Sequence, residues 1–204
     1  MQIYTDFDGT ITDRDSIVLL VQEFGGGDRY RRDLLSEFEN GTLSAAEVIA
    51  EEIASVDASW EEVAACLKET VRVDPTFPGF VNWCRESSIP LCVVSSGLEQ
   101  IIALMIGDLG VPVVAHTARI EGRSWRYHRR PESEKELVVR AASEADEVAF
   151  IGDGISDICV LPYVDRVFAK RYLAKYCRKR GIDFFPYDTF REVRNRLQDE
   201  LQAD

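Results

Sequence analysis

Two aspartates separated by a single residue lie close to the N-terminus, in the run Asp6-Phe7-Asp8-Gly9-Thr10. The apolar residues before them predict a short buried strand, so both carboxylates should extend from its carboxyl end in nearly the same direction. Two like charges this close need a cation or a proton to offset them. The pair therefore suits one ionised nucleophile, one proton donor and a bound magnesium ion. Taken alone, it is equally typical of an acidic turn that caps the next helix.

A second pair of carboxylates follows another apolar run, Val148 to Ile151, in the sequence Gly152-Asp153-Gly154-Ile155-Ser156-Asp157. The glycines allow the backbone to approach a ligand closely. A loop with one capping aspartate is the competing interpretation. Ligands of open α/β sheets bind at the carboxyl ends of the strands, and hard oxygen ligands favour magnesium over zinc. The predicted metal ligands are Asp6, Asp8, Asp153 and Asp157.

Two further segments carry groups that could hold a phosphate. Val93-Val94-Ser95-Ser96-Gly97 offers hydroxyls and backbone amides at the expected start of a helix, although an ordinary N-cap is the simpler interpretation of this run alone. Lys135 lies near another expected helix start, and by itself it would be interpreted as a solvated lysine.

Short apolar runs alternate with helical patterns along most of the chain. This alternation predicts an α/β fold, a Rossmann-like parallel sheet with helices on both faces. The expected strands are Ile3–Thr5, Pro90–Val94, Val111–Ala115, Val148–Ile151 and Val167–Ala169.

Residues 15–74 interrupt the alternation, because they contain helical patterns and no convincing strand. The spacings Ser44-x-x-Glu47 and Ser59-x-x-Glu62 match capping boxes at two helix starts. We expect an inserted all-helical cap domain at 15–74 and a core domain made of 1–14 and 75–204. The helices expected in the cap are at about 15–24, 28–39, 44–56 and 60–71.

Three local features are expected in the second half of the chain. Ile120-Glu121-Gly122-Arg123 resembles a hairpin turn, and Ser133-x-x-Glu136 resembles a third capping box. A mostly charged helix is expected at the surface at about 189–202.

The composition restricts the partners and the compartment. A formal net charge of −12 argues against a nucleic-acid partner and against adhesion to an anionic membrane. No apolar run reaches the ~20 residues that span a bilayer. The five cysteines are dispersed without zinc-ligand spacing, which indicates reduced thiols and a cytoplasmic protein.

Together the four motifs, in this order, resemble those of the haloacid dehalogenase-like phosphatases: D-x-D-G-T, a strand that ends in Ser or Thr, a Lys, and G-D-G-x-x-x-D. The resemblance extends over nearly the whole chain. It implies that Asp6 is the nucleophile, that Asp8 is the general acid and base, and that Mg2+ is the cofactor. It also implies that Ser95, with Ser96 and Gly97, and Lys135 hold the phosphate, that Asp153 binds the metal and that Asp157 supports the metal site.

Within that superfamily the helical cap and the hairpin resemble the phosphoserine phosphatase branch. A nearer resemblance, to the 2-hydroxy-3-keto-5-methylthiopentenyl-1-phosphate phosphatases of methionine salvage, rests on three runs, of which only the first is expected to touch the chemistry. These runs are Asp6–Thr12, Phe168–Leu173 and Pro186–Phe190.

The expected function is magnesium-dependent hydrolysis of a small phosphorylated metabolite by a monomer or homodimer. The enol-phosphate of methionine salvage, phosphoserine, phosphocholine and phosphoethanolamine remain alternative substrates. A phosphotransferase, or a non-catalytic regulatory protein on the same fold, remains an alternative of another class.

Cap residues should set specificity; the candidates to face the leaving group are Asp15, Arg29, Arg31 and Arg32, although salt-bridged or solvated side chains are typical of such positions.

Overall fold

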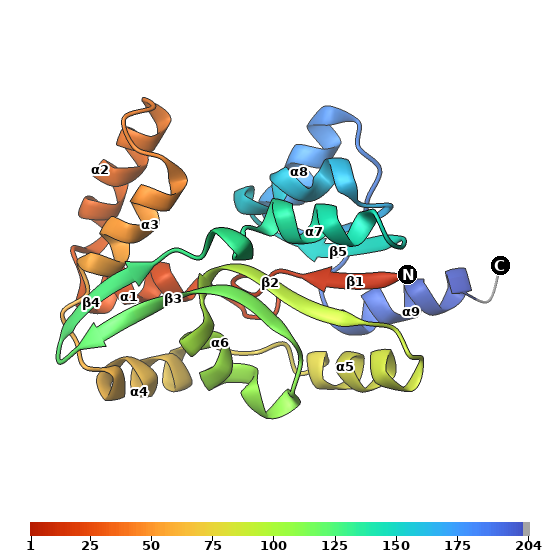
Figure 1. Cartoon of the computed structure of the whole chain (residues 1–204), viewed down its shortest axis with the longest axis horizontal. Coiled ribbons are helices and arrows are strands. Elements are labelled where there is room, and N and C mark those ends of the chain that lie inside the picture. The colour runs from red at the N-terminus through yellow and green to blue at the C-terminus, as the bar shows by residue number, and fades with distance from the viewer. Residues whose placement is uncertain (202–204) are drawn as a thin grey trace.

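A seven-stranded sheet forms the centre of the computed structural model, which describes residues 1–201 (Figure 1). Its strand order is β4-β3-β2-β1-β5-β6-β7, and every neighbouring pair is parallel except the antiparallel pair β3–β4. The strands are β1 (Gln2–Thr5), β2 (Leu91–Leu98), β3 (Val113–Glu121), β4 (Ser124–His128), β5 (Val148–Gly152), β6 (Arg166–Ala169) and β7 (Phe185–Pro186). The expected α/β fold is confirmed.

The central strands are apolar because both faces of the sheet are covered. All five residues of β5 are buried, as expected for a strand between two helical layers. Strand β1 lies between β2 and β5, with Thr5 opposite Val93 and Ile151. This register brings the carboxyl ends of β1, β2 and β5, and the residues that follow them, to one edge of the sheet.

Helices pack on both faces of this sheet (Figure 1). The face that carries α7 (Lys135–Ser143) and α8 (Arg171–Arg180) lies opposite the face that carries α5 (Phe77–Glu86), α6 (Glu99–Ile106) and α9 (Phe190–Leu201). The final helix is anchored by one apolar stripe, in which Phe190 lies 4.8 Å from Phe77, centroid to centroid. Residue 202 of the helix expected at 189–202 falls outside the described residues.

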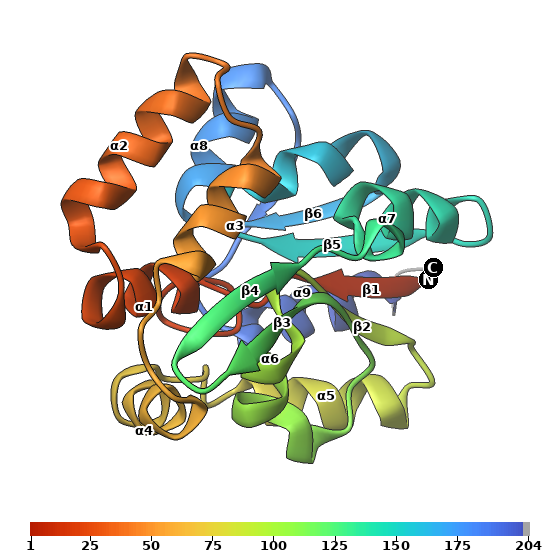
Figure 2. The same ribbon diagram turned by 60° about the vertical axis from the view of Figure 1, so that its left-hand side comes forward.

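Four helices occupy residues 15–74: α1 (Ser16–Phe24), α2 (Gly27–Glu39), α3 (Ala45–Ala54) and α4 (Trp60–Thr70). Helices α1, α2 and α3 stand at the end of the sheet toward which β1 points, and α4 lies beside α6 (Figures 1 and 2). The segment that leads into these helices pairs with the segment that leads out of them. Thr12 forms a β-bridge with Val73, and Asp13 N donates to Arg72 O. The assignment of 15–74 as a separate cap domain stays a prediction.

Most local signals are confirmed, with two corrections. Ser44 and Ser59 form complete capping boxes, and the hairpin turns at Gly122-Arg123. The capping box at Ser133 was wrong: Pro131 starts a separate 3-10 turn over Pro131–Ser133, so α7 begins at Lys135 with Glu134 as its N-cap. The helix start expected at Ser95–Gly97 was also wrong, because β2 continues through Leu98 and α6 begins only at Glu99.

Candidate active site

Three buried carboxylates meet at the carboxyl ends of β1 and β5. Asp6 follows β1, while Asp153 and Asp157 follow β5, and each offers an oxygen within 4.8 Å of the others. Burial and the charge of Asp157 raise the pKa of Asp6 well above its ordinary value, and Lys135 opposes that rise. Burial and Asp157 also raise the pKa of Asp153. A cluster of this kind is costly without added positive charge.

Lys135 supplies part of that charge from the first turn of α7. Its Nζ lies 3.0 Å from Asp6 Oδ1 and 2.6 Å from Asp157 Oδ1, and the side chain is 3% exposed. Although burial lowers the pKa of Lys135, Asp157 and Asp6 raise it above the ordinary value, so the ammonium stays charged. The simplest interpretation of Lys135 by itself, a solvated lysine, is therefore wrong, because the folded chain buries its side chain.

Asp157 is the most completely hydrogen-bonded of the three carboxylates. Its Oδ1 accepts from Lys135, and its Oδ2 accepts from the backbone amides of Asp153 and Gly154 at 3.0 and 2.9 Å. Gly152 gives it room, since a Cβ there would lie 2.5 Å from Asp157 Oδ2. The geometry therefore favours Asp157 as the residue that orients Lys135 and the loop of Asp153, with fewer free lone pairs for a metal.

Asp8 lies beside this cluster and does not belong to it. Its Oδ1 accepts from Ser16 N at 2.8 Å, and its Oδ2 faces the backbone of Gly97. Burial and the charge of Asp15 raise the pKa of Asp8 to about 7. A carboxyl group with this pKa can hold or release a proton near neutral pH, which is the property required of a general acid and base.

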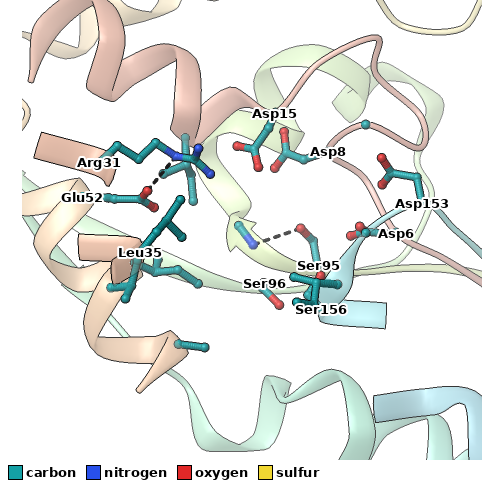
Figure 3. Close-up of a pocket in the computed structure, with 18 of the residues that line it drawn as sticks. Asp6, Asp8, Asp15, Arg31, Leu35, Glu52, Ser95, Ser96, Asp153 and Ser156 are labelled. Carbon is teal, nitrogen blue, oxygen red and sulfur yellow. Dashed lines mark hydrogen bonds and ion pairs between the residues drawn. The ribbon is translucent and has the colours of Figure 1, made fainter. Parts of the chain in front are cut away.

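The segment Ser95-Ser96-Gly97, at the end of β2, faces Asp6 and Asp8 (Figure 3). Ser95 is buried, and its Oγ accepts from Gly97 N at 3.0 Å. Gly97 is required sterically, because a Cβ would lie 2.9 Å from Asp8 Oδ2. These groups come from a strand end, not from the helix start that the sequence predicted.

A cavity of about 370 Å³ extends from these residues to the cap (Figure 3). Its lining includes Asp6, Asp8, Ser95, Ser96, Gly97 and Asp153 from the core, and Asp15 and Arg31 from the candidates in the cap. Arg29 and Arg32 are exposed on α2 and do not line it. Glu52 also lines the cavity, and the sequence did not single it out. Burial raises the pKa of Glu52, and Arg31 Nε lies 3.0 Å from its Oε1.

Arg171 is a second residue that sequence reasoning missed. Its Nη1 lies 3.2 Å from Asp153 Oδ2, its Nη2 donates to Asp13 O at 2.8 Å, and it lines the cavity. Its neighbour Lys170 donates to Thr10 O at 3.0 Å. The run Phe168–Leu173 therefore touches the site, contrary to the expectation that only the first of the three family runs does. The prediction failed because Arg171 and Asp13 lie 158 residues apart in the chain, so no local pattern indicates their contact.

The residues present fit a magnesium ion. Three clustered carboxylates, at Asp6, Asp153 and Asp157, face two cationic side chains, Lys135 and Arg171, so negative charge is in excess. Oxygen ligands of this kind suit a hard divalent cation. Asp6 and Asp153 would hold it. Gly9, with φ +74°, leaves the space beside them open, because a Cβ there would collide with Asp153 Oδ2.

Comparison with known proteins supports the motif assignment. A model of the haloacid dehalogenase-like hydrolase family matches residues 3–162. Pdp3-interacting factor 1 of Schizosaccharomyces pombe is 31% identical over 97% of this chain and 95% of its own length. Polyol phosphate phosphatase PYP1 of Saccharomyces cerevisiae is 27% identical over 99% and 94%. The 2-hydroxy-3-keto-5-methylthiopentenyl-1-phosphate phosphatase of Geobacillus kaustophilus is 26% identical over 96% and 94%.

Solved structures with the same fold include phosphoserine phosphatases. A substrate-bound phosphoserine phosphatase complex superposes with a TM-score of 0.75 and 15% identity over 95% of this chain and 96% of that chain. A phospho-aspartyl intermediate analogue of phosphoserine phosphatase gives a TM-score of 0.73 at 16% identity over 95% and 97%. At these identities the likeness shows the fold alone. The family match over most of the chain shows more: this chain belongs to the haloacid dehalogenase-like hydrolases.

Proposed function

We propose that this chain, a phosphatase of the haloacid dehalogenase-like family, hydrolyses a small phosphorylated metabolite through a covalent aspartyl-phosphate at Asp6, with magnesium as cofactor. The observation that carries the proposal is the buried contact of Lys135 with both Asp6 and Asp157, beside Asp153. It places a carboxylate nucleophile next to a fixed positive charge at the end of a cavity that can hold a substrate.

In the first step a carboxylate oxygen of Asp6 attacks phosphorus, and the bond from phosphorus to the ester oxygen breaks. Asp8 donates its proton to the departing alkoxide, so the alcohol leaves neutral. The pKa of about 7 at Asp8, which arises from burial and from Asp15, keeps a large share of that group protonated near neutral pH.

In the second step Asp8 takes a proton from a water molecule as the water oxygen attacks phosphorus. The bond from phosphorus to Asp6 breaks, and inorganic phosphate is released. Splitting hydrolysis into two displacements is the usual advantage of a covalent intermediate. Lys135 and the Ser95–Gly97 segment bind the phosphoryl oxygens in both steps, because phosphoryl transfer depends mainly on positioning and on neutralisation of charge. Bound magnesium would supply further neutralisation between Asp6 and the substrate phosphate.

The substrate is proposed only as a class. Two of the similar proteins are phosphatases of small metabolites, a polyol phosphate phosphatase and a methionine-salvage phosphatase. A cavity of about 370 Å³ lies at the lower end of the usual range for small-molecule sites.

The described residues 1–201 include no helix long and apolar enough to cross a membrane.

The test is release of inorganic phosphate from a panel of phosphomonoesters with magnesium, with excess chelator, and with the Asp6→Asn protein. We expect turnover by the wild type with magnesium, none in chelator, and none by Asp6→Asn, whose circular dichroism spectrum should be unchanged because little volume is altered. Asp108→Asn, an exposed change in the turn after α6, is the matched control and should keep full activity. An active and folded Asp6→Asn protein would exclude the covalent mechanism.

A further inference from the structure

The cavity changes character between its two ends. At the core end it is lined by aspartates, serines and glycine that suit a phosphate (Figure 3). At the cap end the lining is largely hydrocarbon, which is typical of a pocket that buries part of a small ligand. The apolar residues there are Ile17, Leu35, Phe38, Ala45, Val48 and Ile49.

One cation faces this cap end from the lining, and its charge is already balanced. Arg31 Nε lies 3.0 Å from Glu52 Oε1, and the Glu52 side chain is 7% exposed. Because Glu52 balances the charge of Arg31, the pair adds no net positive charge that would attract an anionic leaving group. Without Glu52, Arg31 would favour an anionic leaving group; with Glu52 paired to it, Arg31 no longer favours one.

Asp15 adds a negative charge at the same end. Its Oδ1 caps α1 by accepting from Val18 N at 2.9 Å, and its charge contributes to the raised pKa of both Asp8 and Glu52. Asp15 is therefore close to both of these acids, and Figure 3 shows its carboxylate directed toward Asp8. A carboxylate on the leaving alcohol would meet two acidic side chains, Asp15 and Glu52, and one arginine whose charge Glu52 already balances.

We propose that the cap end of this cavity selects a leaving alcohol that carries no carboxylate, namely an uncharged hydroxyl-bearing alcohol, with Glu52 and Asp15 as the residues that reject an anion. The inference rests on the proposed function, since it concerns the alcohol half of the same substrate. A hydroxyl of the alcohol can donate to Asp15, while its carbon atoms lie against the apolar wall.

The test uses two esters of nearly equal size, glycerol 3-phosphate and 3-phosphoglycerate, which differ by a hydroxymethyl group in place of a carboxylate. With magnesium, the wild type should show a kcat/KM for glycerol 3-phosphate about 100-fold or more above that for 3-phosphoglycerate, as expected for juxtaposed like charges. Glu52→Gln is isosteric and leaves Arg31 free, so it should shift the ratio toward 3-phosphoglycerate by about 10-fold or more. Asp15→Asn should shift the ratio in the same direction and can still cap α1.

The matched control is Glu39→Gln, an exposed change on α2 outside the cavity lining, which should leave the ratio unchanged. Equal use of the two esters by the wild type would overturn the inference. So would an unchanged ratio in folded Glu52→Gln and Asp15→Asn proteins. Because both variants keep Asp6, a general loss of rate would cancel in the ratio.

Calorimetric binding of the same two esters to the Asp6→Asn protein separates the two proposals. Preferential binding of glycerol 3-phosphate without turnover by the wild type would support the selectivity and contradict the proposed function. Turnover with preferential binding of 3-phosphoglycerate would contradict the selectivity alone.

Discussion

At the scale of single residues, the site is organised around a shortage of positive charge. Lys135 contacts two carboxylates and is almost fully buried, while Arg171 contacts the third carboxylate from a partly exposed position. Arg171 has φ +48°, an uncommon conformation for a residue with a side chain, and such backbone outliers cluster at functional sites. Both cations hold aspartates in fixed positions before any ligand binds.

Replacement of Lys135 by methionine tests this balance. Lys135→Met leaves Asp6 and Asp157 buried without their common partner, so the free energy of unfolding should fall by about 3 kcal/mol, the usual cost of breaking a buried ion pair. Phosphate release should fall by about 10²–10³-fold, as for removal of one preorganised donor. Urea denaturation and a phosphate assay measure these effects.

The control for this change is Lys175→Met, at an exposed position of α8, which should alter neither quantity appreciably. Magnesium should restore part of the lost stability of Lys135→Met, because it supplies positive charge to the same carboxylates. A variant as stable and as active as the wild type would contradict the charge balance described here.

At the scale of elements, the cap helices are held by local caps and by the β3–β4 hairpin. Ser44 and Glu47 form a complete capping box at the start of α3, the helix that carries Val48 and Glu52 into the cavity. The hairpin reaches the cap through Trp125, whose Nε1 donates to Ala58 O at 2.8 Å, and through Arg123, which pairs with Asp57 and Glu62. Arg123 of this hairpin thus serves in ion pairs with the segment that contains α4.

Removal of the Ser44 cap should weaken α3 in proportion to the lost hydrogen bond. Ser44→Ala should lower the free energy of unfolding by about 1 kcal/mol, because the amide of Glu47 loses its acceptor. Ser36→Ala, at an exposed position within α2, is the control and should leave stability unchanged or slightly higher, since alanine favours helix. Equal stabilities of the two variants in urea would show that this cap does not contribute.

At the scale of the whole molecule, one hydrophobic core joins the inserted helices to the sheet. Buried residues of α1, α3 and α4, such as Leu20, Ile53 and Leu67, belong to the same packed cluster as Ile3 of β1 and Val93 of β2. A separate cluster lies on the other face of the sheet, between β5 and α7. Helices α1, α3 and α4 therefore share their core with the sheet that positions the clustered aspartates.

A shared core predicts a single unfolding transition. In scanning calorimetry the measured enthalpy should equal the van't Hoff enthalpy, as for a two-state protein, because the inserted helices cannot lose their packing without exposing the face of the sheet. Two resolved transitions would instead show that residues 15–74 melt as an independent unit.

The alternation of strands and helices, and with it the α/β fold, could be predicted from the sequence, because apolar periodicity and turn residues are local properties of the chain. Asp6, Asp8, Ser95 and Asp153 could be expected at one edge of the sheet, because residues at the ends of parallel strands converge there, whereas the role predicted for Lys135 came only from the family resemblance. Capping boxes at Ser44 and Ser59 were equally readable, since a cap depends on residues three positions apart.

Contacts between side chains far apart in the chain could not be predicted in the same way. Glu52 neutralises Arg31 from a different helix, and Arg171 reaches Asp153 and the loop after β1 from the start of α8. Strand β2 continues through Ser95–Gly97 to Leu98, which pairs with His116 of β3, where the local pattern indicated the start of a helix. Long-range packing and charge pairing depend on the folded positions of elements, which no local pattern of residues encodes, so the phosphate end of the site was visible in the sequence and the alcohol end was not.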